Sequence, residues 1–405
     1  MNSAQPERQL SSRLAMLKPS VTLVISQLAR RLAAEGRDII NMSSGELDFD
    51  TPVHIQDGAM VAMRSGQTRY TDVGGTPALK AAIIEKFKRD NQLDYSPRQI
   101  IASTGAKQII FNAFLATLDV GDEVILNAPY WVSYPEMIRL TGAEPVAIVP
   151  AADEGFKLTP ATLAAVLTAK TRWLLLNSPG NPSGALYSAA ELCALAEVLK
   201  DYPRVLVMSD DIYEHIVYEG KFASFASAVP QMADRTLTIN GVSKTYAMTG
   251  WRLGFAAGPE WLISALAILQ SQSTSCPNAI AQAAAIAALT GPQDLLAEWC
   301  ARLRTRRDSA LAILRQCPAL QVDTPPAAFY LFVGCEKLLG KRTTAGKILN
   351  SDLDVAEYFL QHAGVAVVPG SAFGMAPYFR LAYSIADDDV NRACQLMVNA
   401  CEALI

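Results

Sequence analysis

The sequence predicts an α/β protein whose larger part is a mostly parallel β-sheet covered by helices. Short apolar runs of strand length alternate with longer helical patterns through the middle of the chain, which is typical of βαβ units. Of the 405 residues, 51% are hydrophobic and 18% charged, enough apolar side chains to bury both faces of such a sheet. Because the chain is longer than one average domain, we expect a second, smaller domain.

The expected strands of the large domain are short runs rich in apolar and β-branched residues. They are Ile100–Ser103, Glu123–Asn127, Trp173–Asn177, Val205–Ser209, Leu237–Asn240 and Gly254–Ala257. The helices expected between them keep apolar residues three and four positions apart. These helices are Lys107–Leu118, Tyr134–Leu140, Ala189–Leu199 and Trp261–Gln270. Residues 261–293 carry no charge, but the polar stretch QSQSTSCPN divides them, so two buried helices are expected there and not a membrane span.

The pattern changes after about residue 297, where an α+β domain is expected. Its predicted helices are Leu303–Gln316, Val355–His362 and Asp387–Leu404, and its predicted strands are Phe329–Val333, Val365–Val368 and Phe379–Tyr383. We therefore assign residues 45–296 to the large domain, and residues 1–44 and 297–405 to an N-terminal arm with the small domain.

Charge, cysteine and histidine content exclude several classes of protein. The net charge of −4 provides no field that would recruit nucleic acid or anionic membranes. The seven cysteines are scattered without a CxxC pair, which favours reduced thiols in a cytoplasmic protein over disulfides or a zinc site. The three histidines lie far apart in the sequence, so no metal site is expected. The first twenty residues lack the apolar core of a signal peptide.

Polar side chains follow three successive expected strands. WLLLN leads to Asn181, VLVM leads to Asp210, and LTIN leads to Lys244. Ligands of open parallel sheets lie beyond the carboxyl ends of the strands, so an amide, a carboxylate and an amine are expected at one edge of the sheet. The alternative is that each residue is only a loop residue or a helix cap.

Lys244 carries the strongest chemical signal. It lies between the apolar segments Leu237–Ile239 and Leu253–Ala257, where loss of water would lower the pKa of an amine and make it nucleophilic. Arg252, eight residues later, offers a planar fork for a carboxylate or phosphate. Residues Ser103–Lys107 join a strand to a helix, and backbone N–H groups at a helix start suit a phosphate. Together these features suggest a carbonyl cofactor held as an imine beside an anionic group.

Nearly the whole chain resembles the class I aminotransferases of fold type I, which use pyridoxal 5′-phosphate. The segments SGELDFDTP, PYWVSYPE, NSPGNPSG, SDDIYEH, SKTYAMTGWRLG, AVVPGSAFG and FRLAYS occur in the family's order and spacing. The resemblance is greatest to the bacterial aspartate aminotransferase subgroup that includes prephenate-active members. It implies the fold of that family, a transaminase activity, pyridoxal phosphate as the cofactor, and a homodimer.

The resemblance also implies roles for residues around the cofactor ring. Lys244 resembles the lysine that forms the internal aldimine and then moves the proton of the substrate. Asp210 resembles the carboxylate that pairs with the pyridine nitrogen. Asn181 and Tyr213 match the residues that hydrogen-bond the phenolic oxygen of the ring. Trp131 matches the aromatic residue that stacks on the ring, although a tryptophan there could also be a core residue.

Other residues match the family's phosphate and substrate contacts. The phosphate would be held by Gly105, Ala106, Lys107, Arg252 and, across the dimer, by Tyr70 of the partner subunit. Ser243 is a further cofactor-binding candidate, although its side chain could point elsewhere. Gly241 stands where many relatives have a serine or threonine contacting the phosphate. The implied substrate-binding residues are Gly45, Trp131, Asn181 and Arg380 for the α-carboxylate end, and Ser20, Thr22 and Lys107 for a distal carboxylate.

Alternatives remain for the substrate and the reaction. Lys107 could serve the phosphate or solvent, Gly45 could be an ordinary turn glycine, and Leu47 replaces a usual proline beside it. The leading hypothesis is a cytoplasmic transaminase that moves the amino group of an aspartate- or glutamate-type donor to a 2-oxo acid. A lyase or a specialised biosynthetic aminotransferase would use the same cofactor chemistry. A regulatory module is disfavoured, because residues 1–20 are too short for a DNA-binding extension.

Overall fold

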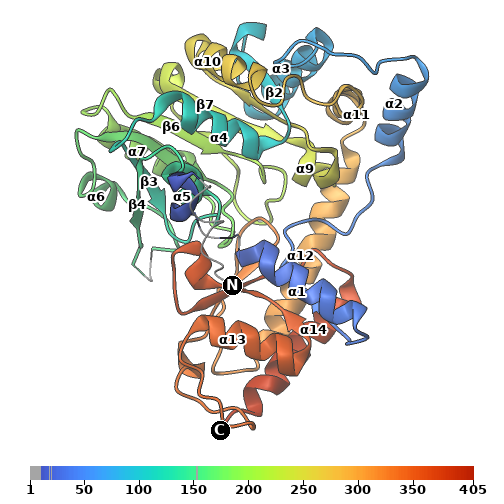
Figure 1. The fold of residues 1–405 in the computed structure, drawn as a ribbon, viewed down its shortest axis with the longest axis vertical. Helices are drawn as coiled ribbons and strands as arrows, with labels where there is room; N and C mark the ends of the chain where they lie inside the picture. Colours follow the sequence, from blue (N-terminus) through green and yellow to red (C-terminus); the bar gives the residue numbers. More distant parts are fainter. Residues whose placement is uncertain (1–10, 18, 20, 152–153) are drawn as a thin grey trace, which may run out of the picture.

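The computed structural model describes residues 11–17, 19, 21–151 and 154–405. Its main sheet has seven strands in the order β2-β8-β7-β6-β5-β3-β4 (Figure 1). Their bounds are β2 Ile100–Ser103, β3 Glu123–Asn127, β4 Glu144–Ile148, β5 Thr171–Asn177, β6 Leu206–Asp210, β7 Thr236–Gly241 and β8 Gly254–Ala257. Neighbouring strands are parallel except for β8, which is antiparallel to both β2 and β7. The predicted α/β class with a mostly parallel sheet is confirmed.

Helices cover both faces of this sheet because successive strand residues point to opposite faces. On one face, Ile101, Trp173 and Leu175 pack against helices α4, α5 and α10. On the other face, Ile100 and Ala102 pack against α3 and α11, while β5 and β6 pack against α6, α7 and α8. The bounds of these helices are α3 Pro77–Asn91, α4 Ala106–Thr117, α5 Tyr134–Arg139, α6 Pro160–Ala164, α7 Ala189–Leu199, α8 Phe225–Ala228, α10 Glu260–Ser271 and α11 Ala279–Thr290.

The C-terminal part has its own core and a three-stranded sheet in the order β11-β12-β9. Its elements are β9 Tyr330–Gly334, α13 Asp352–Tyr358, β10 Val365–Ala366, β11 Val368–Pro369, β12 Tyr378–Ala382 and α14 Asp387–Glu402. The N-terminal helix α1 (Val21–Ala34) packs on this part through Ala29 and Leu32, and the short strand β1 (Ile40–Asn41) pairs with β10. Helix α1 also contacts β11, and Figure 1 shows it against the C-terminal part of the molecule.

One predicted strand was wrong in detail and one strand was missed. The predicted strand Val365–Val368 is divided, because β10 pairs with β1 while β11 pairs with β12 in a different sheet. The strand β4 was missed, because it lies at the sheet edge with only Ile148 buried and therefore lacks a continuous apolar run. Edge strands with one neighbour tolerate such polar sequences.

Helix α12 (Asp294–Leu314) connects the two parts of the molecule (Figure 1). It begins before the predicted helix start at Leu303 and crosses residue 297 without interruption. The domain boundaries at residues 45 and 297 therefore stay a prediction.

The uncharged stretch 261–293 forms most of α10 and α11, as expected. Among the residues that the structure describes, no helix is both long and apolar enough to cross a membrane.

Candidate active site

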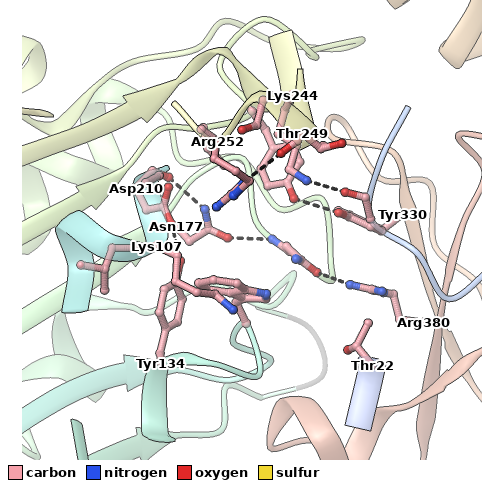
Figure 2. A pocket seen from close by; sticks show the side chains of 18 residues that line it. Thr22, Lys107, Tyr134, Asn177, Asp210, Lys244, Thr249, Arg252, Tyr330 and Arg380 are labelled. Atoms are coloured by element: carbon pink, nitrogen blue, oxygen red, sulfur yellow. Dashed lines mark hydrogen bonds between the residues drawn. The ribbon is translucent and has the colours of Figure 1, made fainter. Parts of the chain in front are cut away.

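The carboxyl ends of β5, β6 and β7 lie next to one another and open into a cavity of about 290 Å³ (Figure 2). Asn177 ends β5, and Asp210 ends β6. Helix α9 (Val242–Thr245) follows β7 directly and carries Lys244. Three adjacent parallel strands thus deliver an amide, a carboxylate and an amine to one cavity, as the rule for open α/β sheets predicts.

Most residues singled out from the sequence line this cavity. They are Thr22, Gly45, Ala106, Lys107, Trp131, Asn181, Asp210, Tyr213, Ser243, Lys244, Arg252 and Arg380. Gly105 is not among the lining residues but lies next to Arg252, which is. Tyr70 does not line the cavity of its own subunit, and 92% of its surface is exposed. Ser20 lies outside the described residues.

Lys244 is an amine in the cavity wall with charges of both signs near it. Its Nζ donates a hydrogen bond to the carbonyl oxygen of Gly45. Burial lowers the pKa of Lys244 to about 8, and the nearby charges of Arg380 and Arg252 act in the same direction against the opposing effect of Glu46. A lysine with this pKa is partly neutral at physiological pH, which a nucleophile or a base requires.

Asp210 is a buried carboxylate with one free oxygen. Its Oδ2 accepts a hydrogen bond of 2.5 Å from the hydroxyl of Tyr134, and its backbone oxygen accepts one of 2.9 Å from Asn177. Its Oδ1 is buried and has no hydrogen-bond partner among the described residues. Burial raises the pKa of Asp210 to about 6. A buried oxygen without a partner is costly, so this oxygen fits a donor supplied by a ligand.

Arg380 is held at the other end of the cavity by contacts that leave part of its fork free. Nη1 donates to Oδ1 of Asn181 at 2.9 Å, and Nη2 donates to the carbonyl oxygen of Ser43 at 2.5 Å. Its Nε has no partner among the described residues. The guanidinium stacks on Tyr330 and Phe373, 4.6 and 5.0 Å from the ring centroids. Burial lowers the pKa of Arg380, and no carboxylate of the described residues forms an ion pair with it, so an anionic ligand would be stabilised here.

A second anion site lies where α4 begins. Gly105 has a φ of 89°, and a Cβ there would lie 2.3 Å from Nη2 of Arg252, so only glycine fits. A Cβ at Gly254 would lie 2.2 Å from the backbone N of Ala106. The two glycines let Arg252 and the first N–H groups of α4 meet at one point, which suits a phosphate. Arg252 itself has a left-handed φ of 54° and donates to the backbone oxygen of Thr249 at 2.9 Å.

Lys107 projects from the first turn of α4 toward Trp131, with Nζ 4.6 Å from the centroid of the indole ring. Burial lowers the pKa of Lys107, and the charge of Arg252 lowers it further. No acidic side chain in the described part of the chain forms an ion pair with Lys107. The cavity therefore contains a third cation that lacks a counter-ion.

Sequence reasoning missed six residues that line the cavity: Ile110, Tyr134, Asn177, Ile212, Thr249 and Tyr330. Asn177 ends the strand WLLLN and could have been found by the same strand-end argument as Asp210. Tyr134 lies in the segment PYWVSYPE, but only the fold brings it to Asp210. Tyr330 comes from β9, where nothing in the sequence marks it.

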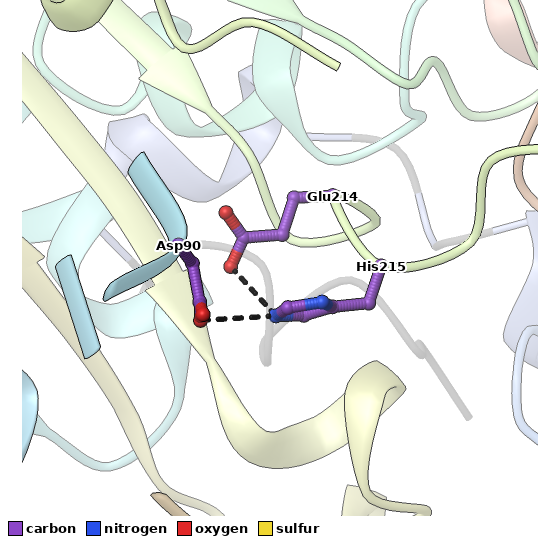
Figure 3. A group of neighbouring side chains, drawn as sticks. All are labelled: Asp90, Glu214 and His215. Atoms are coloured by element: carbon purple, nitrogen blue, oxygen red, sulfur yellow. Dashed lines mark ion pairs between the residues drawn. The ribbon is translucent and has the colours of Figure 1, made fainter. Parts of the chain in front are cut away.

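One cluster whose residues do not line the cavity has the residue types of a metal site (Figure 3). Asp90, Glu214 and His215 place one potential ligand atom each within 4.8 Å of one another. However, Nζ of Lys86 forms an ion pair with Glu214, and Arg89 pairs with Asp90 at 2.7 Å. Although burial lowers the pKa of His215, its contacts with Glu214 and Asp90 raise it to about 9. The acids are thus neutralised by protein cations, and the cluster is a buried ion network.

These features form a cavity of an α/β protein that is suited to a small anionic molecule, with an amine of lowered pKa and two arginines in its wall. The family described as "Aminotransferase class I and II" matches residues 37–396. The chain belongs to this family and is a transaminase.

Similar proteins cover nearly the whole chain. A "Probable aspartate/prephenate aminotransferase" of Rickettsia bellii is 48% identical over 98% of this chain and 99% of its own length. The crystal structure of the aspartate aminotransferase from Rhizobium meliloti has a TM-score of 0.95 at 48% identity, covering 98% of this chain and 100% of that one. The aspartate aminotransferase from Thermus thermophilus with maleate has a TM-score of 0.89 at 38% identity, covering 96% and 99%.

Proposed function

We propose that this transaminase uses pyridoxal 5′-phosphate bound to Lys244 and takes its amino group from an aspartate-type dicarboxylic amino acid. The observation that carries the proposal is that one cavity brings together three groups. They are the amine of Lys244, whose pKa is lowered, the Oδ1 atom of Asp210, which has no hydrogen-bond partner among the described residues, and the guanidinium of Arg380, whose Nε has none either. These are the three groups that a carbonyl cofactor with a basic ring nitrogen and a substrate carboxylate would need.

The residues fit the cofactor at each end. Oδ1 of Asp210 would accept the N–H of a protonated ring nitrogen, which would pair this buried acid with a cation. Arg252, Ser243 and the start of α4 beside Gly105 and Ala106 would hold the phosphate. When bound, pyridoxal phosphate supplies an aldehyde for attachment of amines and an aromatic ring that accepts electrons.

The chain's own residues would then orient the substrate and move one proton. Arg380, held by Asn181, would bind the α-carboxylate and fix the direction of the Cα–H bond. Lys244, once released from the cofactor, would take the proton from Cα, because its lowered pKa leaves it partly neutral. Trp131 would pack on the ring, and Tyr213 would hydrogen-bond its phenolic oxygen.

The dicarboxylic substrate class is supported by Lys107 and Thr22, which line the same cavity. Lys107 lacks an acidic partner among the described residues, so the second carboxylate of aspartate or glutamate would neutralise it. The relatives are named aspartate or aspartate/prephenate aminotransferases, and the Thermus structure contains maleate, a dicarboxylate. Leu47, the feature that kept a lyase open, does not line the main cavity, so no observation favours that alternative.

We further propose a cytoplasmic homodimer. Tyr70 is almost fully exposed and lies in the loop between α2 (Val53–Arg64) and α3, where it could reach the phosphate site of a second copy. All seven cysteines are free thiols, as expected in a reducing compartment.

The purified protein with pyridoxal phosphate is expected to absorb visible light and to transfer amino groups between aspartate and 2-oxoglutarate with parallel steady-state lines. Borohydride treatment followed by peptide mapping should place the cofactor on Lys244. Lys244→Ala should melt near the temperature of the wild type and lack transamination. Retained transamination in that variant, or cofactor mapped to another lysine, would refute the assignment.

A further inference from the structure

Tyr330 lines the cavity but has no role in the proposed function so far, and it contacts both Tyr213 and Arg380. Its side chain is fully buried, and its hydroxyl lies 2.8 Å from the hydroxyl of Tyr213 (Figure 2). Its ring lies 4.6 Å from the guanidinium of Arg380. A Cβ at Gly45 would lie 2.5 Å from the Tyr330 hydroxyl, so this hydroxyl also packs against the backbone that faces Lys244.

The backbone holds Tyr330 in place. In the antiparallel pair of β9 and β12, Tyr330 is opposite Ala382 and Phe332 is opposite Arg380, so Tyr330 and Arg380 share a face. Ala328, two residues before Tyr330, has a left-handed φ of 60°, unfavourable for a residue with a side chain. Its carbonyl oxygen accepts hydrogen bonds from the hydroxyls of Tyr218 and Tyr383. Local strain is thus maintained by tertiary contacts directly beside a cavity residue.

The direction of the Tyr213–Tyr330 hydrogen bond follows from counting hydrogens. Each hydroxyl has one hydrogen to donate and can accept another bond. The proposed function requires Tyr213 to donate its only hydrogen to the phenolic oxygen of the cofactor. Tyr330 must then donate the hydrogen bond to Tyr213. A hydroxyl that accepts a hydrogen bond becomes a better donor. Tyr330 would therefore strengthen the bond from Tyr213 to the cofactor.

We propose that Tyr330 is a positioning residue of the transamination site, which donates to Tyr213 and thereby aims and strengthens the hydrogen bond of Tyr213 to the cofactor oxygen. This inference rests on the proposed function. The three-stranded sheet of the C-terminal part would then act on both ligands. Arg380 on β12 would bind the substrate carboxylate, and Tyr330 on β9 would support the cofactor contact of Tyr213.

The test is a pH titration of the visible absorbance of the cofactor-loaded protein. A weaker hydrogen bond from Tyr213 leaves more negative charge on the ring oxygen of the cofactor. This charge stabilises the protonated form of the nitrogen that joins Lys244 to the cofactor, and the pKa of that nitrogen rises. Tyr330→Phe is therefore expected to raise the titration midpoint by about half a unit. Because the effect acts through Tyr213, the double variant with Tyr213→Phe should titrate like Tyr213→Phe alone.

Two further variants separate positioning from general damage. Tyr358→Phe removes the hydroxyl of another buried tyrosine, which donates to the backbone oxygen of Ala400 at 2.9 Å, and its midpoint should equal that of the wild type. Ala328→Gly keeps both cavity hydroxyls but relaxes the backbone before Tyr330 and removes a buried methyl group beside it, so its midpoint should move in the same direction but less.

An unshifted midpoint in Tyr330→Phe, or an equal shift when Tyr213 is already phenylalanine, would overturn the assignment of Tyr330. Either result in a protein that still absorbs visible light would leave the proposed function intact. A wild-type protein without visible absorbance in the presence of pyridoxal phosphate would instead refute the proposed function.

Discussion

Asp211 provides a quantitative test of the electrostatics beneath the active site. It directly follows Asp210 and is buried, and its Oδ1 accepts a hydrogen bond of 2.6 Å from Ser209. Burial raises the pKa of Asp211 from 3.8 to about 7. The folded protein therefore binds a proton here that the unfolded chain releases above about pH 4. Consequently, the contribution of Asp211 to the free energy of unfolding falls as pH rises from about 4 to about 7 and then levels off.

The expected size follows from the shift of the pKa. A difference of about three units corresponds to about 4 kcal/mol, which is the full cost of the ionised form above pH 7. Asp211→Asn keeps the shape and stays neutral, and its amide can donate to the hydroxyl oxygen of the neighbouring Ser224. Between pH 5.5 and pH 8.5, the stability of this variant relative to the wild type should increase by about 2 kcal/mol.

Urea unfolding at a fixed protein concentration, repeated at several pH values, measures this difference. Asp201→Asn is the matched control, because Asp201 is exposed, and its stability should track that of the wild type at every pH. A difference between Asp211→Asn and wild type that stays constant from pH 5.5 to pH 8.5 would show that Asp211 titrates normally in the folded protein. The reasoning about its burial would then be refuted.

Three other substitutions test the site and its support. Arg380→Lys should lower kcat/KM about 100-fold, or about 2.7 kcal/mol, because an ammonium cannot make the bidentate contact; unchanged steady-state kinetics would contradict this role. Lys107→Met should raise KM for aspartate at least about tenfold and leave KM for a monocarboxylic donor unchanged, and an equal change for both donors would assign Lys107 to the phosphate. Glu214→Gln should destabilise the fold by about 3 kcal/mol in urea unfolding, because it leaves Lys86 buried without a full counter-charge, whereas the exposed change Glu197→Gln should have little effect. Chelator should not alter the melting temperature of the wild type, and a fall would indicate a bound metal in that cluster.

The sheet and the strand-end chemistry were accessible from the sequence because both depend on local patterns. Predicted strands such as Ile100–Ser103 and Glu123–Asn127 match the structure to the residue, since both contain a run of three buried apolar residues. The apolar pattern does not specify the order of the strands, and it is this order that makes β5, β6 and β7 neighbours. Likewise, the antiparallel direction of β8 was not predicted, because a buried strand has the same apolar sequence in either direction.

The residues that sequence reasoning missed act through contacts between distant segments. Tyr134 reaches Asp210 across 76 positions, and Tyr330 reaches Tyr213 across 117. Neither tyrosine has a local pattern that distinguishes it from a core aromatic residue, because its function depends on a partner that only the fold provides. Gly105 shows the same limit, since its left-handed φ of 89° and the guanidinium of Arg252 beside it exist only in the folded protein.

The balance of charge in the cavity explains why its substrates should be anions at several points. Lys107, Lys244, Arg252 and Arg380 line it, whereas Asp210 is the single acidic residue among the described residues of its wall. Each buried cation without a counter-ion is costly, so a phosphate at Arg252 and carboxylates at Arg380 and Lys107 would each remove part of that cost. The charges of Arg380 and Arg252 also lower the pKa of Lys244, in addition to the larger effect of burial and against the opposing charge of Glu46. A phosphate and carboxylates at these positions would therefore remove more of the cost of the buried cations than a neutral ligand of the same shape.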